Sequence, residues 1–222
     1  MTASDDLPPQ LAAVGAFLAH APLRSTVATL EIALAGCGAA QAGDVSREHG
    51  VTPELFRAAL AARDSFGKLS DLIHAVAITL ALEHILEPGE ELLRPSLAAG
   101  NTPDRLFDVE TNLRIAEFKL SRWDGHDGGR QQPTVKDLVR LAADTSGRKA
   151  ELYVRGDRPI TWLRSTSSSV RQQLRRYRND LAVFEGTFGD PDATVAAFVA
   201  GAGAHVALVD FEELAPELFG AL

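Results

Sequence analysis

The stretch FDVETNLRIAEFKL, Phe107–Leu120, decides how we interpret the fold of this chain. Apolar and charged residues alternate along it, which is typical of β-strands with one buried face. Asn112 and Leu113 interrupt the alternation and fit a two-residue turn. The stretch therefore predicts a β-hairpin, and the rest of the chain is interpreted around it.

Four charged residues fall on one face of this predicted hairpin. Because strand side chains alternate, Asp108 lies opposite Glu117, and Glu110 and Lys119 share their face. Like charges opposite one another destabilise a sheet, and a divalent cation bound by the carboxylates would relieve the repulsion. A bound metal can activate water for attack on a phosphodiester, so the patch predicts hydrolysis of nucleic acid. The alternative is that the charges form only the solvated face of a hairpin.

Asp108 followed by Glu117-Phe118-Lys119 resembles the PD-(D/E)XK signature of the restriction-endonuclease-like nucleases, although the proline that opens the motif is missing. The resemblance implies that Asp108 and Glu117 hold Mg²⁺ or Mn²⁺ together with the backbone carbonyl of Phe118. It implies that Lys119 positions the attacking water or helps to deprotonate it. Glu110 would adjust the patch from outside the metal shell. Because members of that family act mostly on DNA, the resemblance implies DNA as substrate and partner.

The segments around the hairpin follow the element order of the resembled core. A helix is predicted over Ser70–Leu86 and a strand over Glu91–Leu97 before the hairpin. After it we predict a helix over Pro133–Asp144 and strands over Ala150–Arg155 and Pro159–Arg164. We therefore expect an α/β fold, a central mixed sheet with flanking helices, in which residues 70–165 form a restriction-endonuclease-like core.

Two further parts are predicted outside that core. Residues 1–69 form a helical extension, and residues 166–222 form a basic helix followed by closing α/β elements. Within the extension, Asp44–Asp64 resembles a helix-turn-helix with Arg57 and Arg63 facing outward. A plain helical hairpin packed on the core gives the same pattern, so this alternative stays open.

Two groups of side chains are candidates for contacts with nucleic acid. They are Arg122, Trp123 and Arg130 in the glycine-rich segment after the hairpin, and Arg171, Arg175 and Arg178 in a later basic stretch. Trp123 either stacks on a base or covers the edge of the sheet. The last three arginines fall at helical spacing on one face, which suits phosphates. Alternatively, they pair with acids of this chain or of a second subunit in a homodimer.

Composition limits the remaining classes of protein. The chain has 222 residues, of which 45% are hydrophobic and 23% charged, as in an ordinary globular protein. Its net charge of -8 argues against non-specific coating of nucleic acid, so any contact must come from a local basic patch. Cys37 is the only cysteine, which suits a reducing compartment. The N-terminal residues MTASDDLPPQ differ from a secretory signal, and we expect a soluble cytoplasmic protein without a membrane partner.

Other catalytic motifs are missing from the sequence. It contains no G-x-x-x-x-G-K-[ST] phosphate loop, no G-x-G-x-x-G fingerprint, no G-x-S-x-G and no H-E-x-x-H. We therefore predict a metal-dependent nuclease. The alternative is a non-catalytic DNA-binding or regulatory protein that uses the helix-turn-helix-like segment and the basic stretch. A third hypothesis is a structural, partner-binding protein that relies on the apolar helices.

Overall fold

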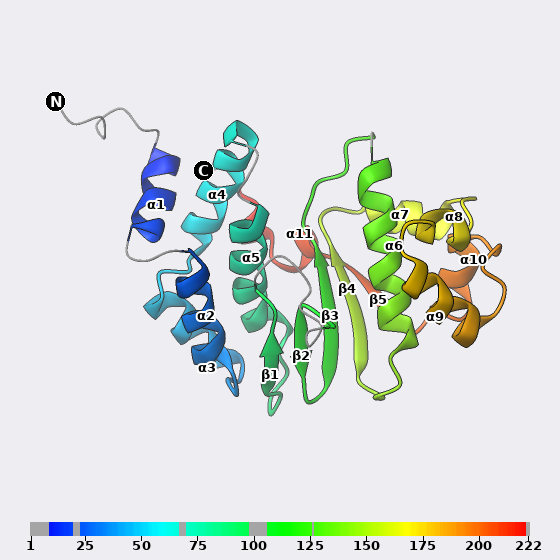
Figure 1. The fold of residues 1–222 in the computed structure, drawn as a ribbon. Coiled ribbons are helices and arrows are strands. Elements are labelled where there is room, and N and C mark those ends of the chain that lie inside the picture. Colours follow the sequence, from blue (N-terminus) through cyan, green and yellow to red (C-terminus); the bar gives the residue numbers. More distant parts are fainter. Residues whose placement is uncertain (1–8, 20–22, 67–69, 98–105, 126, 221–222) are drawn as a thin grey trace. The chain divides into compact units, whose positions relative to one another are not determined.

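The computed structural model describes residues 9–19, 23–66, 70–97, 106–125 and 127–220 and has an α/β fold (Figure 1). The strands are β1 (Leu92–Pro95), β2 (Val109–Thr111), β3 (Arg114–Lys119), β4 (Lys149–Val154) and β5 (Val206–Asp210). They follow the order β1-β2-β3-β4-β5 in a mixed sheet. The predicted α/β class with a mixed sheet and helices is thus confirmed.

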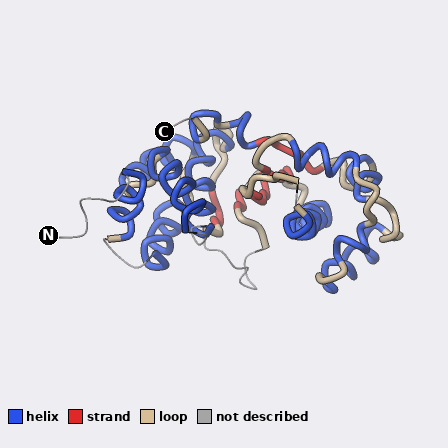
Figure 2. Tube along the Cα trace, turned by 90° about the horizontal axis from the view of Figure 1, so that it is seen from above, coloured by secondary structure: helices blue, strands red, loops and turns tan. Residues whose placement is uncertain are grey.

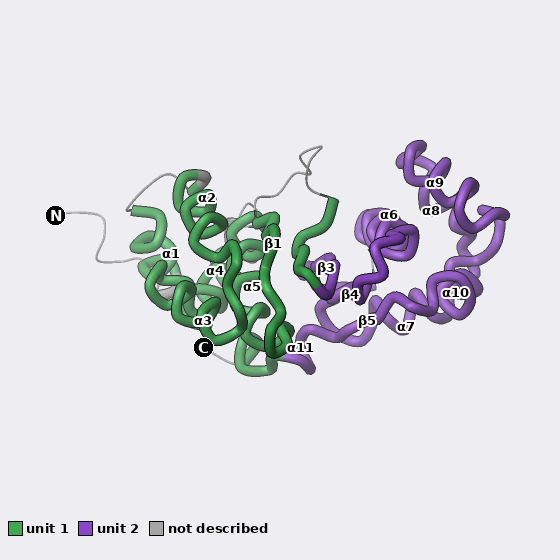
Figure 3. The backbone as a smooth tube through the Cα atoms, turned by 90° about the horizontal axis from the view of Figure 1, so that it is seen from below, with its two compact units in different colours: residues 1–112, 215–222 green, residues 113–214 purple. Residues whose placement is uncertain are grey.

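The helices before the sheet are α1 (Pro9–Leu18), α2 (Leu23–Leu34), α3 (Ala39–Glu48), α4 (Pro53–Phe66) and α5 (Ser70–Ile85). The later ones are α6 (Gly128–Ala143), α7 (Arg158–Ser165), α8 (Val170–Leu174), α9 (Arg178–Phe188), α10 (Val195–Ala200) and α11 (Phe211–Leu214), with a 3₁₀ turn η1 (Pro216–Leu218). The backbone falls into two compact units, Met1–Asn112 with Ala215–Leu222, and Leu113–Leu214 (Figure 3). The boundary lies inside the segment 70–165.

The first unit is mostly helical and is built on α5. Figure 2 shows that helix predominates in the part of the chain nearest the N-terminus. α5 is apolar on all sides and nearly all of its residues are buried, so α3 and α4 can both pack against it. The hydroxyl of Thr52 accepts a hydrogen bond of 3.2 Å from the N–H of Leu55, which caps the start of α4. β1 pairs antiparallel with β2 in the same unit.

The segment that resembled a helix-turn-helix is a pair of helices packed on α5. Gly50 between α3 and α4 has a φ of 70°, a conformation that glycine adopts without strain. Arg57 does not face outward, because its guanidinium binds Glu54 at 2.8 Å and the backbone carbonyl of Glu217 at 2.8 Å. The side chain of Arg63 lies outside the described residues. The packing agrees with the helical-hairpin alternative, and the predicted exposure of Arg57 is wrong.

The second unit is organised on three parallel strands. β4 lies between β3 and β5, with Glu117 beside Leu152 and Leu152 beside Leu208. Parallel strands are usually covered on both faces, and β3 is buried along almost its whole length. α6 connects β3 to β4 and packs against both strands. Phe118 stacks on Tyr153 across the sheet, with ring centroids 4.6 Å apart.

The segment Pro159–Arg164, predicted as a strand, is the helix α7. Pro159 stands in the first turn of the helix, where its missing N–H leaves no hydrogen bond unmade. Pro159 and Leu163 are four residues apart and are the buried residues of α7. A six-residue segment is too short to be assigned to strand or helix by periodicity alone, which explains the wrong prediction.

Tyr153 is buried next to a charged pair within the second unit. Its hydroxyl donates a hydrogen bond to Glu151, and that carboxylate pairs with Arg114 at 2.7 Å. Burial raises the pKa of Tyr153 well above its ordinary value, and the negative charge of Glu151 adds to the effect. The folded protein therefore holds the phenolic proton more tightly than the unfolded chain does.

This raised pKa predicts a loss of stability in alkali. The contribution is fully present below the unfolded-state pKa of about 10 and is lost as the pH rises from there toward the folded-state pKa. We expect the free energy of unfolding to fall by up to about 1.4 kcal/mol per pH unit above that point, and Tyr153→Phe to remove this component. Urea unfolding of both proteins at about pH 9, 10 and 11 measures it. Equal slopes for the two proteins would contradict the prediction.

Candidate active site

Glu117, Lys119 and Asp137 form a buried group in the second unit, which we call the acid-lysine cluster. Glu117 and Lys119 are two residues apart on β3 and so point to the same face. Lys119 Nζ lies 3.2 Å from Glu117 Oε2 and 2.6 Å from Asp137 Oδ2, which α6 contributes. The exposed fractions of Glu117 and Asp137 are 4% and 2%. One ammonium is therefore held between two carboxylates that are almost fully withdrawn from water.

Asp137 was missed by the sequence analysis. α6 buries an apolar side that includes Val135, Leu138 and Val139, and Asp137 lies among these residues. Charged residues are rarely fully buried unless they are paired, so a carboxylate there requires a cation. The signal in the sequence was a single acid inside an apolar run of an amphipathic helix. Which partner it would find depends on the packing of α6 on β3.

Further charges surround the acid-lysine cluster. Arg140 of α6 contacts Asp180 of α9, with 2.5 Å between Nε and Oδ1. Burial opposes the charged form of Arg140, but the hydrogen bond and charge of Asp180, together with the charges of Asp137 and Glu117, outweigh it and raise its pKa. Lys136 Nζ lies 2.8 Å from Asp137 Oδ1. Three acids and three bases therefore balance one another in this region.

One buried oxygen of the cluster lacks a hydrogen bond. The contact between Lys136 and Asp137 Oδ1 is close but has no hydrogen-bond geometry, so this oxygen finds no donor among the described residues. The cluster offers only oxygen ligands, the carboxylates of Glu117 and Asp137 and, as the resemblance implies, the carbonyl of Phe118. Such ligands suit Mg²⁺ or Mn²⁺, and Mg²⁺ is usually bound by one or two carboxylates with water. The donor set thus fits the metal that the resemblance implies.

The arrangement of the acidic and histidine side chains sets a limit on that metal site. Within the part of the chain that the structure describes, no group of three or more His, Cys, Asp or Glu side chains converges. A cation at the acid-lysine cluster would therefore rely on two carboxylates of the second unit, with carbonyl and water oxygens completing its shell.

Asp108 and Glu110 lie in the first unit. Asp108 directly precedes β2, and its Oδ1 lies 3.1 Å from Nε2 of His74 on α5. Glu110 is on β2 and pairs in register with Arg94 of β1. β2 ends and β3 begins with two residues between them, as the predicted turn requires. The role of these two acids beside Glu117 stays a prediction.

The three residues after β3 that were predicted to contact nucleic acid, Trp123, Arg130 and Arg122, do not form one exposed surface loop. Trp123 is 5% exposed, and its ring is tilted against that of Trp162 of α7 with ring centroids 5.5 Å apart. A side chain this deeply buried presents no free face to a base, so the structure disagrees with the stacking alternative. Arg130 belongs to the first turn of α6 and not to a loop, and it pairs with Asp127 at 2.9 Å. Arg122 is exposed.

The predicted arginine stripe is divided between two helices. Arg171 lies in α8, Arg175 follows its last residue, and Arg178 begins α9. Tyr177, with φ of -112° and ψ of 69°, leaves the helical conformation and separates them, so the three side chains do not share one helical face. Arg171 pairs with Asp192 at 2.9 Å, as the acid-pairing alternative predicted. Arg175 and Arg178 are exposed.

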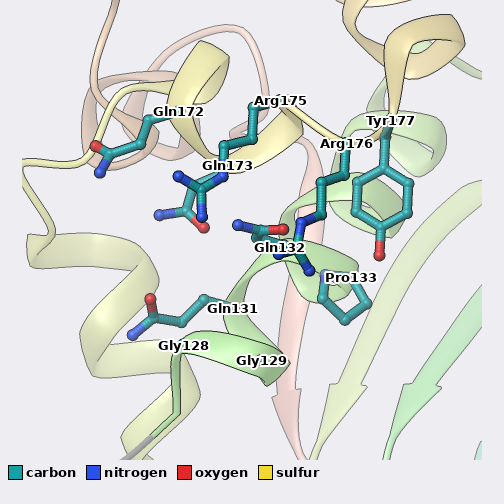
Figure 4. A pocket seen from close by; sticks show the side chains of 10 residues that line it. All are labelled: Gly128, Gly129, Gln131, Gln132, Pro133, Gln172, Gln173, Arg175, Arg176 and Tyr177. Atoms are coloured by element: carbon teal, nitrogen blue, oxygen red, sulfur yellow. The ribbon is translucent and has the colours of Figure 1, made fainter.

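A cavity of about 460 Å³ lies beside the first turns of α6 (Figure 4). Its lining consists of Gly128, Gly129, Gln131, Gln132, Pro133, Gln172, Gln173, Arg175, Arg176 and Tyr177. Figure 4 shows the side chains of Arg175 and Arg176 reaching toward the glutamines of α6 and α8. The volume lies within the range of about 300–1,000 Å³ that is usual for small-molecule sites.

Comparison of the chain with protein-family models, with curated proteins and with solved structures gives no match. None of the described helices combines the length and the apolar run that crossing a bilayer requires. The inference of function therefore rests on the acid-lysine cluster, the cavity and the motif resemblance.

Proposed function

We propose that this chain is a metal-dependent nuclease that hydrolyses phosphodiester bonds, with DNA as the expected substrate. The observation that carries the proposal is the acid-lysine cluster, in which Lys119 is held between two buried carboxylates. Withdrawing carboxylates from water is costly even when they are paired, and such arrangements concentrate at functional sites. The cluster includes the acid-any-lysine sequence on β3 that carries the resemblance to the PD-(D/E)XK nucleases.

The residues of the cluster have distinct roles in this proposal. Glu117 and Asp137, with the carbonyl of Phe118, would hold Mg²⁺ or Mn²⁺. When bound, the metal supplies a Lewis acid and a water of lowered pKa. Lys119 carries N–H donors and no acceptor in its ammonium form, so it can orient a water through its oxygen or stabilise charge on a phosphate.

A second candidate function is DNA binding without catalysis. The observation that favours it is the charge balance of the region around the cluster, since three acids and three bases already compensate one another. Structural ion-pair networks have this property. In that case the exposed Arg175, Arg176 and Arg178 would supply contacts to phosphates.

The two functions separate in a cleavage experiment with the full chain. Supercoiled and linear DNA are incubated with Mg²⁺, with Mn²⁺ or with a chelator, and DNA binding is measured under the same conditions. We expect cutting with either metal and none with chelator. If neither DNA is cut and binding is unchanged by the chelator, the nuclease proposal fails and the binding protein takes its place.

A further inference from the structure

We propose that the cavity beside the start of α6 is a binding site for a nucleotide, held by its phosphate group. The proposal rests on the charge of the lining, on the backbone of α6 and on one buried amide. It does not depend on catalysis, and all of the residues involved belong to the second unit.

The lining is cationic in a protein whose net charge is -8. Arg175 and Arg176 are both exposed, and neither forms an ion pair with any residue that the structure describes. No carboxylate occurs among the ten lining residues. A guanidinium group presents a planar set of donors that matches phosphate oxygens in pairs. Two unpaired arginines at one cavity therefore favour a phosphate over an uncharged ligand.

The start of α6 adds backbone donors to this charge. Asp127 precedes the helix, but its carboxylate does not cap it and instead accepts hydrogen bonds from the N–H groups of Asp124 and Gly125. Gly128 and Gly129 begin the helix, and a Cβ at either position would meet no atom within 4 Å. A ligand can therefore approach this backbone closely. The N-terminus of a helix favours anions through its N–H groups and dipole.

Gln173 gives independent support for a ligand. It is 5% exposed and lines the cavity, and its Oε1 has no hydrogen-bond partner among the described residues. Buried polar groups are normally paired, so this acceptor calls for an N–H or O–H donor. The phosphate dianion of a nucleotide has only acceptors, so the nucleotide must supply the donors from elsewhere. The amino and hydroxyl groups of a nucleoside supply them.

The glutamines of α6 match the same class of ligand. Gln131 and Gln132 line the cavity with amides that can both donate and accept hydrogen bonds, as the edge of a base requires. The cavity volume of about 460 Å³ suits a ligand of nucleotide size. Phosphate, sugar and base thus each find a complementary part of the lining.

Contacts along α6 connect the cavity to the acid-lysine cluster. The ring of Tyr177 lies 5.6 Å from Lys136 Nζ, and the same ammonium lies 2.8 Å from Asp137 Oδ1. Pro133 and Asp137 are one helical turn apart, about 6 Å along the axis. If the proposed nuclease function holds, a nucleotide of the substrate strand occupies the cavity next to the cluster. If it does not, the cavity still binds a nucleotide.

The proposal is tested by calorimetric titration of the full chain in the presence of chelator. The probes are inorganic phosphate, deoxyadenosine, deoxyadenosine 5′-monophosphate, and one oligonucleotide with a 5′-phosphate or a 5′-hydroxyl. We expect the monophosphate to bind more tightly than either phosphate or nucleoside. Arg175→Gln and Arg176→Gln should each weaken its binding by about 10- to 100-fold. Arg164→Gln, which removes an exposed arginine outside the cavity, should change it less than about twofold.

Gln173→Leu tests the buried amide separately. It should weaken binding of the monophosphate and leave binding of inorganic phosphate unchanged. Preference for the 5′-phosphorylated oligonucleotide over the 5′-hydroxyl form would identify a strand end as the ligand. Binding of the mononucleotide but of neither oligonucleotide would identify a free nucleotide as the ligand. Absence of saturable binding by every probe overturns the proposal, as does binding that Arg175→Gln and Arg176→Gln leave unchanged. Because no metal is present, failure of the nuclease proposal does not alter this result.

Discussion

Replacing Lys119 by methionine should reduce metal-dependent DNA cleavage by at least about a hundredfold, because the substitution removes the donor that orients water or stabilises charge in the proposed site. It should also lower the free energy of unfolding by about 3 kcal/mol, since Glu117 and Asp137 then remain buried without their shared cation. This loss of unfolding free energy should lie near the lower limit of the range that is usual for a broken buried ion pair, because Lys136 and Arg140 keep positive charge near the two carboxylates. Cleavage rates and urea unfolding measure the two effects.

A double variant separates the loss of chemistry from the loss of folding. Lys119→Met combined with Glu117→Gln removes one charge of each sign, so it should recover much of the stability and remain inactive. Arg164→Met, which removes an exposed cation from α7 in the same unit, serves as the control and should retain both properties. Cleavage by Lys119→Met at the rate of the control would show that Lys119 has only a structural role.

Replacing Arg114 by methionine should cost about 3–5 kcal/mol of unfolding free energy. Arg114 is 3% exposed, and its Nη1 lies 2.7 Å from Glu151 Oε2 and 3.5 Å from the hydroxyl of Tyr153. Removing the guanidinium leaves the Glu151 carboxylate, whose side chain is only 15% exposed, without its cation. Equilibrium unfolding in urea measures the effect.

The surface pair of Arg171 and Asp192 provides the control for that experiment. Both side chains are about half exposed or more, so Arg171→Met should leave the free energy of unfolding nearly unchanged. Arg114→Met combined with Glu151→Gln should be more stable than Arg114→Met alone, because no unpaired charge remains buried. A loss for Arg114→Met no larger than that for Arg171→Met would contradict the assigned role of the buried pair.

The strands and the turn of the stretch Phe107–Leu120 were predicted correctly because they depend on neighbouring residues alone. Alternation of side chains and a two-residue break predict two strands and a turn, and β2 and β3 begin and end accordingly. α5 likewise follows from an apolar run that Pro88 and Gly89 end. The start of α6 was placed too late because a proline usually marks the first turn, whereas Pro133 lies inside the helix.

Only two of the three residues of the acid-lysine cluster could be predicted, because the third, Asp137, comes from another element. Glu117 and Lys119 are two residues apart on one strand, so their shared face follows from the sequence. Asp137 reaches Lys119 only through the packing of α6 on β3, which periodicity does not specify. Tyr177 divides the predicted basic helix. Arg176, which the sequence analysis did not select, lines the cavity.

The most direct measurement of the proposed function is one DNA-cleavage time course with Mn²⁺ that compares the wild type with three isosteric variants. Glu117→Gln and Asp137→Asn each remove one carboxylate of the acid-lysine cluster. Asp192→Asn removes an exposed carboxylate from the same unit and serves as the control. We predict that the wild type and Asp192→Asn cut at the same rate and that the two cluster variants lose about a hundredfold or more. Cutting by both cluster variants at the wild-type rate would contradict the proposal that this cluster is the active site.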